Sequence, residues 1–256
     1  MHPSLETRDL TIRFGGHVAV NSVSCAFVPG TLTAIVGPNG AGKTTYFNLI
    51  SGQLKASAGQ VLLHGRDISA LAAPARTHAG LGRAFQLTNL FPNLSVMENV
   101  RLALQSRARL GLDLWNVWSD HTELTGRADE LLETVALEDK RDLTAASLPH
   151  GDQRKLEVGI LMALDPDVYM FDEPTAGMSV DEVPVILDLI RNLKASREKT
   201  ILLVEHKMDV VRELADRIIV LHNGTLMADG EPETVIASPV VQQAYLGLAP
   251  VEEAAT

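Results

Sequence analysis

The chain is poor in cysteine, in aromatic residues and in basic residues, and it has no long apolar run. One of its 256 residues is a cysteine and 4% are aromatic. A single cysteine excludes an internal disulfide bond, and Cys25 lies in a strand-like run where a small buried thiol is expected. The longest apolar runs, such as 32–36 and 201–204, are far shorter than the ~20 residues that cross a bilayer. No basic-then-apolar leader opens the chain, so we expect a cytosolic protein.

The charge balance argues against a nucleic-acid partner. The 32 acidic residues outnumber the 22 basic ones, which gives a formal net charge of −10. Nucleic-acid binding draws on a basic face that neutralises phosphates, and the basic clusters here are short, such as Arg154-Lys155. The chain has no internal repeat or low-complexity tract, and its length suffices for one large domain or two small ones.

What the chain does contain is a full match to the phosphate-binding loop G-x-x-x-x-G-K-[ST]. The match and the residue after it are Gly37, Pro38, Asn39, Gly40, Ala41, Gly42, Lys43, Thr44 and Thr45. An apolar run over 32–36 enters the loop as a strand should, and a helix-compatible stretch over 44–50 leaves it. This ordered setting disfavours the alternative, a glycine-rich turn without a ligand.

The loop predicts binding of a nucleoside triphosphate and Mg²⁺. Its glycines let several N–H groups point at one phosphate, and the following helix adds its free N–H groups and positive dipole end. Lys43 is expected to reach the β- and γ-phosphates, and the Thr44 hydroxyl to bind Mg²⁺.

A second motif is the apolar run 168–171, which ends in Asp172 and Glu173. A buried strand would deliver Asp172 to its carboxyl end to hold Mg²⁺, and Glu173 beside the γ-phosphate as the general base for water. A core strand that ends in two solvated acids is the alternative, and the phosphate loop disfavours it.

Alternating strands and helices around the loop predict an α/β fold with a parallel sheet. The early strands suggest an added antiparallel sheet, and 88–164 suggests a helical insert. We expect one domain over 1–256, with a frayed tail at about 248–256. The predicted strands are 5–14, 18–28, 32–36, 59–63, 82–86, 167–171, 200–204, 217–221 and 226–229. Helices are predicted after the loop, from the Ser95 capping box, and over 127–136, 151–164, about 181 onward, and 207–215.

The order of these motifs resembles that of the ATP-binding subunits of ABC transporters. The phosphate loop is followed by Leu148-Pro149-His150-Gly151-Asp152-Gln153, then by Asp172-Glu173-Pro174-Thr175-Ala176-Gly177, then by Glu205-His206. The likeness covers essentially the whole chain. It implies an ABC-type P-loop core and an ATPase that dimerises around two ATP molecules.

The resemblance also implies roles for single residues. Phe14 would stack on adenine, although a core aromatic at a strand end is the alternative. Gln86 would contact Mg²⁺ and the attacking water and link the site to the membrane partner. His206 would contact the γ-phosphate and hold Glu173 in place; the alternative is a structural histidine at a strand end. Gly151 would bind the ATP of the opposite subunit. The other histidines lack metal-ligand spacing, so no zinc site is expected.

The chain departs from the family pattern in two places, the signature segment and the loop after the acidic strand. Where the signature usually reads Leu-Ser-Gly-Gly-Gln, this chain has Pro149 in place of the serine, without a hydroxyl or a backbone N–H. The lost hydrogen bond to a charged group would cost about 1.5–3 kcal/mol. Ser179 stands where the family often has Asp. In an assembly of two different ATP-binding subunits, the composite site that uses this signature is therefore expected to be weakened, and the other would pair the loop of this chain with the partner's signature.

Among subfamilies the chain looks most like the importers of branched-chain or other hydrophobic amino acids. The motifs that carry this likeness are 13–16, 176–178, Glu205-His206 and 244–247. Urea and amide importers and lipopolysaccharide exporters share some of them. The implied partners are permease subunits, a second ATP-binding subunit of the same or another kind, and indirectly a periplasmic solute-binding protein, which places the chain peripherally on the inner face of the membrane.

Two other classes compete with this interpretation. A soluble ABC ATPase without a transport role would usually carry two cassettes, a coiled coil or a basic linker, none of which is found here. A regulatory module with little turnover is suggested by Pro149 alone. Trp115 and Trp118 lie in the predicted insert and would face either the membrane subunit or the interior of the insert. The cargo itself is not encoded in an ATPase that never touches it.

Overall fold

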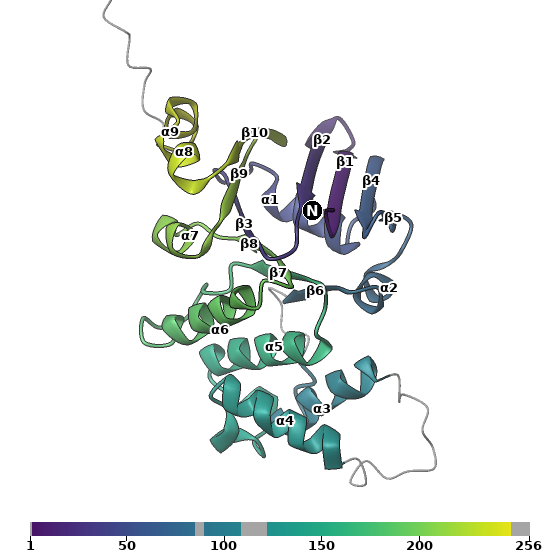
Figure 1. Ribbon diagram of the computed structural model, residues 1–256, viewed down its shortest axis with the longest axis vertical. Coiled ribbons are helices and arrows are strands. Elements are labelled where there is room, and N and C mark those ends of the chain that lie inside the picture. Colours follow the sequence, from purple (N-terminus) through teal and green to yellow (C-terminus); the bar gives the residue numbers. More distant parts are fainter. Residues whose placement is uncertain (1, 85–89, 109–121, 247–256) are drawn as a thin grey trace, which may run out of the picture. The chain divides into compact units, whose positions relative to one another are not determined.

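The computed structural model describes residues 2–84, 90–108 and 122–246. The chain divides into two compact units, one made of Met1–Ala73 with Thr200–Thr256 and the other of Pro74–Lys199. We call them unit 1 and unit 2 and describe each by itself (Figure 1). The predicted single domain over 1–256 stays a prediction, and the tail at 248–256 lies outside the described residues.

Unit 1 contains the antiparallel sheet that the early strands predict. Its strand order is β2-β1-β4-β5. The strands are β1 Leu5–Phe14, β2 His17–Phe27, β4 Ala58–Leu63 and β5 Arg66–Asp67. The first two are joined by a turn at Gly15-Gly16, and Phe14 pairs with His17 beside it.

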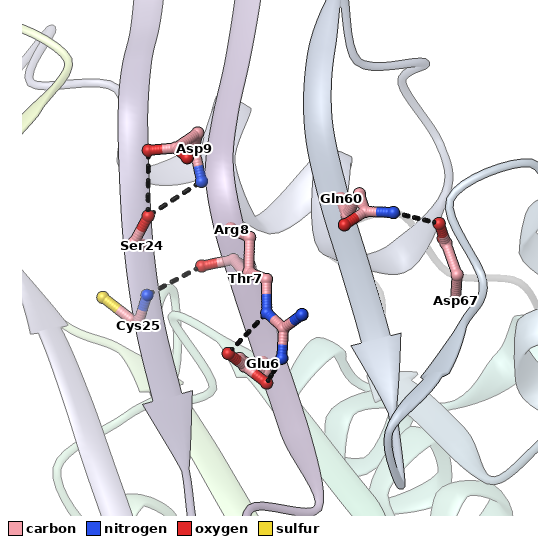
Figure 2. Close-up of polar contacts among 8 residues, drawn as sticks. All are labelled: Glu6, Thr7, Arg8, Asp9, Ser24, Cys25, Gln60 and Asp67. Carbon is pink, nitrogen blue, oxygen red and sulfur yellow. Dashed lines mark hydrogen bonds and ion pairs between the residues drawn. The ribbon is translucent and has the colours of Figure 1, made fainter.

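Polar contacts on this sheet follow an irregularity in β1. Asp9 has a left-handed φ of 46°, where the register with β2 shifts. As Figure 2 shows, the Asp9 N–H donates to Ser24 Oγ at 2.8 Å, and the Cys25 N–H donates to Thr7 Oγ1 at 3.0 Å. Cys25 is buried, as its sequence setting predicts, and burial raises the pKa of its thiol.

Unit 1 also holds three parallel strands, with β3 in the middle. Strand β3 pairs in parallel with β8 on one side and β9 on the other, and β10 pairs antiparallel with β9. The bounds are β3 Leu32–Val36, β8 Thr200–Val204, β9 Arg217–His222 and β10 Thr225–Gly230. All residues of β3 and β8 are buried, as is typical of parallel strands covered on both faces.

Four helices accompany these strands in the described part of unit 1. They are α1 Lys43–Ser51, α7 Met208–Leu214, α8 Pro232–Ala237 and α9 Pro239–Leu246. The last three gather on one side of β9 and β10, coloured green to yellow in Figure 1, over a valine-rich core. Helix α1 is anchored on β1 by Tyr46, whose fully buried hydroxyl lies 2.8 Å from Thr7 Oγ1.

Unit 2 combines a parallel strand pair with a group of helices. Strands β6 Leu81–Ala84 and β7 Val168–Asp172 pair in parallel, and β7 is wholly buried. The helices are α2 Ala73–His78, α3 Val96–Arg107, α4 Thr122–Thr134, α5 His150–Leu164 and α6 Val183–Ala195. Helix α2 begins at the last residue of the first segment of unit 1. Short 3-10 helices lie at Glu138–Lys140 and Ala145–Ser147. Helices α3, α4 and α5 pack on one another, at the position of the predicted insert (Figure 1).

Most predicted elements occur, with changes at their ends. The Ser95–Glu98 capping box opens α3 as expected. Helix α4 starts at Thr122 rather than at 127, and α6 starts at Val183, so that Pro184 falls in its first turn. No helix in the described ranges combines the length and apolar character that crossing a membrane requires.

Candidate functional site

The phosphate loop lies between the end of β3 and the start of α1, as predicted. Gly37 and Gly42 are required there by close backbone contacts. A Cβ on Gly37 would lie 2.2 Å from the carbonyl oxygen of Leu221, and one on Gly42, which has φ +97°, would lie 2.5 Å from that of Ala19. Any larger residue would push the loop away from the strands that shape it.

The turn between β9 and β10 supports this loop. The Gly224 N–H donates to the Ala41 carbonyl at 3.0 Å, and the Asn21 N–H donates to the Gly224 carbonyl at 2.8 Å. A Cβ on Gly224 would lie 2.6 Å from the Ala19 oxygen. The sequence predicts a hairpin over 222–225 from its Asn-Gly pair, but it gives no signal for the contact with the loop, which joins residues about 180 positions apart.

Lys43 is buried and lies against its own loop. Its ammonium donates to the carbonyl oxygens of Gly37 at 2.7 Å and Pro38 at 3.0 Å. Asn39, Gly40 and Thr44 are exposed beside it. A largely desolvated cation in a glycine-lined loop, at the N-terminus of a helix, has the chemistry to bind an anion such as a phosphate.

Glu205 and His206 follow β8 in the same unit. The buried Glu205 carboxylate accepts hydrogen bonds from the backbone N–H groups of His206 at 2.8 Å and Lys207 at 3.2 Å. Glu205 thereby fixes the backbone at the start of α7. The His206 side chain is exposed.

Phe14 is 51% exposed at the end of β1. The alternative, a core aromatic at a strand end, is therefore wrong for the free chain. An exposed phenyl face suits stacking on a planar ring such as a nucleobase.

In unit 2 the acidic pair stands where β7 ends. Asp172 is 3% exposed, and its Oδ2 accepts a hydrogen bond from the Arg83 guanidinium at 2.6 Å. Within the described part of the chain its other oxygen, Oδ1, is buried without a hydrogen-bond partner. A buried carboxylate oxygen without a donor fits a hard cation such as Mg²⁺. Glu173 is partly exposed and has a left-handed φ of 50°.

The signature segment opens α5. Pro149 is the N-cap residue, and it makes no side-chain cap hydrogen bond. Gly151 in the first turn is buried beneath the Glu182 carboxylate, which itself accepts hydrogen bonds from the Ser179 N–H at 3.0 Å and Oγ at 2.8 Å. These bonds hold the pKa of Glu182 below its ordinary value. Glu182 is not among the predicted site residues. The spacing Ser179-x-x-Glu182, which is the pattern of a capping box, is the sequence signal that could have indicated its contact with Ser179.

The structure thus groups the predicted residues within each unit. Unit 1 holds Phe14, the phosphate loop and His206, and unit 2 holds Gly151, Asp172 and Glu173. The meeting of the two groups across one triphosphate remains a prediction. Gln86, Trp115 and Trp118 lie outside the described residues.

A glycine-lined loop between a buried parallel strand and a helix, together with an acid-tipped parallel strand, defines a P-loop nucleotide-binding protein. Comparison with known proteins agrees with this class. The family model described as "ABC transporter" matches residues 20–176. The "High-affinity branched-chain amino acid transport ATP-binding protein LivG" of Escherichia coli (strain K12) is 36% identical over 250 residues, which is 96% of this chain and 98% of that protein.

Two further proteins give the same result. The protein BraF of Pseudomonas aeruginosa, with the same descriptive name, is also 36% identical over 96% of this chain and 98% of its own length. A solved ATP-binding cassette of an ABC transporter in its ADP conformation superposes with a TM-score of 0.81 at 29% identity, over 97% of this chain and 100% of that chain. The chain belongs to the ABC transporter family and is an ATPase of its ATP-binding cassette type, which confirms the predicted fold class.

Proposed function

We propose that this chain is the ATP-hydrolysing subunit of an importer for branched-chain or other hydrophobic amino acids. One observation carries the choice of cargo. The similarity to proteins named as branched-chain amino acid transport ATP-binding proteins, at 36% identity, extends over 96% of the chain. It is therefore not confined to the motifs that all cassettes share.

Binding of ATP begins at the phosphate loop. Lys43 now donates to two loop carbonyls, and in the complex its ammonium exchanges them for oxygens of the β- and γ-phosphates. The N–H groups at the start of α1 complete the anion site. The exposed Phe14 ring stacks on the adenine.

Thr44, Asp172 and Gln86 are the residues that would hold Mg²⁺, through hydroxyl, carboxylate and amide oxygens, which this cation prefers. The buried Oδ1 of Asp172 supports this assignment, since it has no donor in the described part of the chain. When bound, the ion stabilises negative charge on the transferring phosphoryl group.

Hydrolysis requires a water molecule in line with the γ-phosphate. Glu173 directly follows Asp172 at the end of β7, and it orients this water and accepts its proton. His206, whose backbone is fixed by Glu205, contacts the γ-phosphate and Glu173. Catalysis then depends on placement and electrostatics, without a covalent intermediate.

The proposed assembly contains two ATP-binding subunits and permease subunits, with a periplasmic solute-binding protein supplying the amino acid. The chain lies on the inner face of the membrane. ATP contacts both cassettes only in the closed dimer, where Gly151 of one faces the nucleotide of the other. Nucleotide binding therefore shifts the equilibrium toward closure, and hydrolysis reverses the shift.

The substitution Glu173→Gln tests the hydrolytic part. We expect ATP affinity to remain and turnover of the assembled transporter to fall by roughly 100-fold or more, the usual contribution of a general base. Glu198→Gln, at an exposed position outside the site, is the matched control. Turnover near the wild-type rate would refute the role of Glu173.

The cargo is tested separately in vesicles that contain the whole transporter and its binding protein. ATP-dependent uptake of labelled leucine, isoleucine or valine is expected. Uptake of urea without uptake of these amino acids would show that the cargo is wrong and would leave the ATPase assignment intact.

A further inference from the structure

The end of β7 lies beside a buried arginine that the predicted mechanism does not use. In the parallel pair of β6 and β7, Arg83 is opposite Met170. Asp172 follows Met170 by two residues, so its side chain projects from the same face of the sheet as that of Arg83. The Arg83 guanidinium donates to Asp172 Oδ2 at 2.6 Å.

This ion pair is buried on both sides. The side chain of Arg83 is 5% exposed and that of Asp172 is 1% exposed. Burial lowers the pKa of Arg83 and the Asp172 charge counteracts this, and a guanidinium stays protonated at neutral pH. A buried pair contributes little to stability compared with well-packed apolar residues, but the loss of one partner leaves the other as an uncompensated charge.

The two oxygens of Asp172 have different surroundings. Oδ2 is held by Arg83, whereas Oδ1 is buried and accepts no hydrogen bond within the described ranges. One fixed oxygen determines the direction of the other. The carboxylate therefore presents one defined oxygen rather than rotating to satisfy both.

We propose that Arg83 is a positioning residue that holds Asp172 by Oδ2 and so directs Oδ1 to the divalent cation. The inference rests on the proposed function, in which Asp172 binds Mg²⁺. In the nucleotide-free chain Arg83 is the counter-ion of this carboxylate. In the complex it keeps the ligand oxygen in place, which lowers the concentration of Mg²⁺ that the site requires.

A purely structural bridge between β6 and β7 would show the same geometry but would not affect the metal. Nucleotide binding separates the two roles. Metal-free ATP relies on the phosphate loop of unit 1, whereas Mg-ATP also relies on Asp172 of unit 2. A positioning role therefore changes the magnesium dependence of binding and leaves the affinity for metal-free ATP unchanged.

The experiment measures ATP binding to the purified full chain as a function of Mg²⁺ concentration. Arg83→Met removes the charge and the donors but keeps most of the volume, and we expect it to raise the half-saturating Mg²⁺ concentration at least roughly tenfold, as for loss of a charge-assisted hydrogen bond. Arg83→Lys keeps a charged donor and should remain within about threefold of the wild type. The affinity for ATP in EDTA should not change in either variant.

Arg107→Met is the matched control. Arg107 also donates to an aspartate of unit 2 at 2.6 Å, namely Asp165, but the two side chains are 49% and 35% exposed. Its removal should leave the magnesium curve unchanged. If Arg83→Met does not fold, Arg83→Gln, which keeps an amide donor without the charge, replaces it and should give a smaller rise.

The outcomes separate the inference from the function on which it rests. If the ATP affinity of the wild-type chain does not depend on the Mg²⁺ concentration, the assignment of Asp172 is refuted, and the inference with it. The inference alone would be overturned if ATP binding to the wild type depends on Mg²⁺ but the folded variant has an unchanged or lowered half-saturating Mg²⁺ concentration. If Arg83→Met lowered the affinity for ATP in EDTA as much as the affinity for Mg-ATP, Arg83 would have a merely structural role.

Discussion

The Glu182 carboxylate lies directly against Gly151, so that a Cβ built on this glycine would be 2.1 Å from Glu182 Oε1. Gly151 belongs to the first turn of α5, whose free N–H groups favour an anion. In the proposed dimer this turn faces the γ-phosphate held by the second subunit. The chain thus places its own negative charge where a phosphate is expected to bind.

Glu182→Gln keeps the shape of this side chain and removes its charge. We expect ATP-dependent dimers to form at a nucleotide concentration roughly two- to fivefold lower, because a repulsion near the helix terminus is lost. Light scattering on the hydrolysis-deficient Glu173→Gln background measures this. Glu130→Gln, on the exposed face of α4, is the control. An effect of the opposite sign would mean that Glu182 supports the closed dimer.

A second prediction concerns the turn that supports the phosphate loop. Gly224→Ala should weaken ATP binding, because its Cβ would overlap the Ala19 oxygen. For the same reason it should lower the free energy of unfolding by about 1–3 kcal/mol in addition to the cost of backbone strain. Gly65→Ala is matched to it, since the two φ angles are +75° and +76° but a Cβ built on Gly65 would meet no atom of the described residues within 4 Å, apart from its chain neighbours. Calorimetric titration with ATP and urea unfolding provide the two readouts. Equal effects in the two variants would contradict the supporting role.

A third prediction is a pH dependence of stability from Asp152, which stands where the family signature has glutamine. Burial would raise the pKa of Asp152, but hydrogen bonds from Lys140 and from Lys155, the latter at 3.0 Å, outweigh burial and hold it below the ordinary value. The folded chain therefore binds this proton more weakly than the unfolded chain does. The resulting stability is present above the ordinary pKa of about 3.9 and is lost as the pH falls through the lower folded value.

Asp152→Asn should accordingly lower the free energy of unfolding at pH 7 by about 1–2 kcal/mol, a figure reduced because Lys140 is partly exposed. The difference from the wild type should shrink between pH 5 and pH 3. Urea unfolding across this range measures it, with the exposed Asp188→Asn as control. A difference that grows toward low pH would contradict the sign of the shift.

A fourth prediction concerns Pro149, the N-cap residue of α5 that makes no side-chain cap hydrogen bond. Pro149→Ser restores a hydroxyl and a backbone N–H at the signature site. If the proline weakens one composite site, the variant should increase ATP turnover of the assembled transporter. The expected increase at that site is roughly tenfold, because one charge-assisted hydrogen bond is regained. Unchanged turnover would refute the weakened site.

The local parts of this site were predictable from the sequence. The phosphate loop, the Ser95 capping box and the hairpin at Asn223-Gly224 are each specified by neighbouring residues, and each occurs at its predicted position. The predicted strand 82–86 overlaps the described β6, Leu81–Ala84, but it gave no reason to single out Arg83.

The contacts that support the site were not predictable in this way. Arg83 meets Asp172 across 89 positions, and Gly224 meets Ala41 across 183, because parallel strands join distant segments. A single charged residue in a short strand, or a glycine in a turn, does not identify its partner. Only the register of β6 with β7 and of β3 with β9 brings these residues together.

The decisive measurement is the affinity of the purified chain for Mg-ATP, compared between the wild type and Lys43→Ala. We expect saturable binding to the wild type and a loss of roughly tenfold or more in the variant, because a buried charge-assisted contact to phosphate is removed. A folded wild-type chain that does not bind Mg-ATP, or a Lys43→Ala variant that binds it equally well, would show that the phosphate loop is not an ATP site.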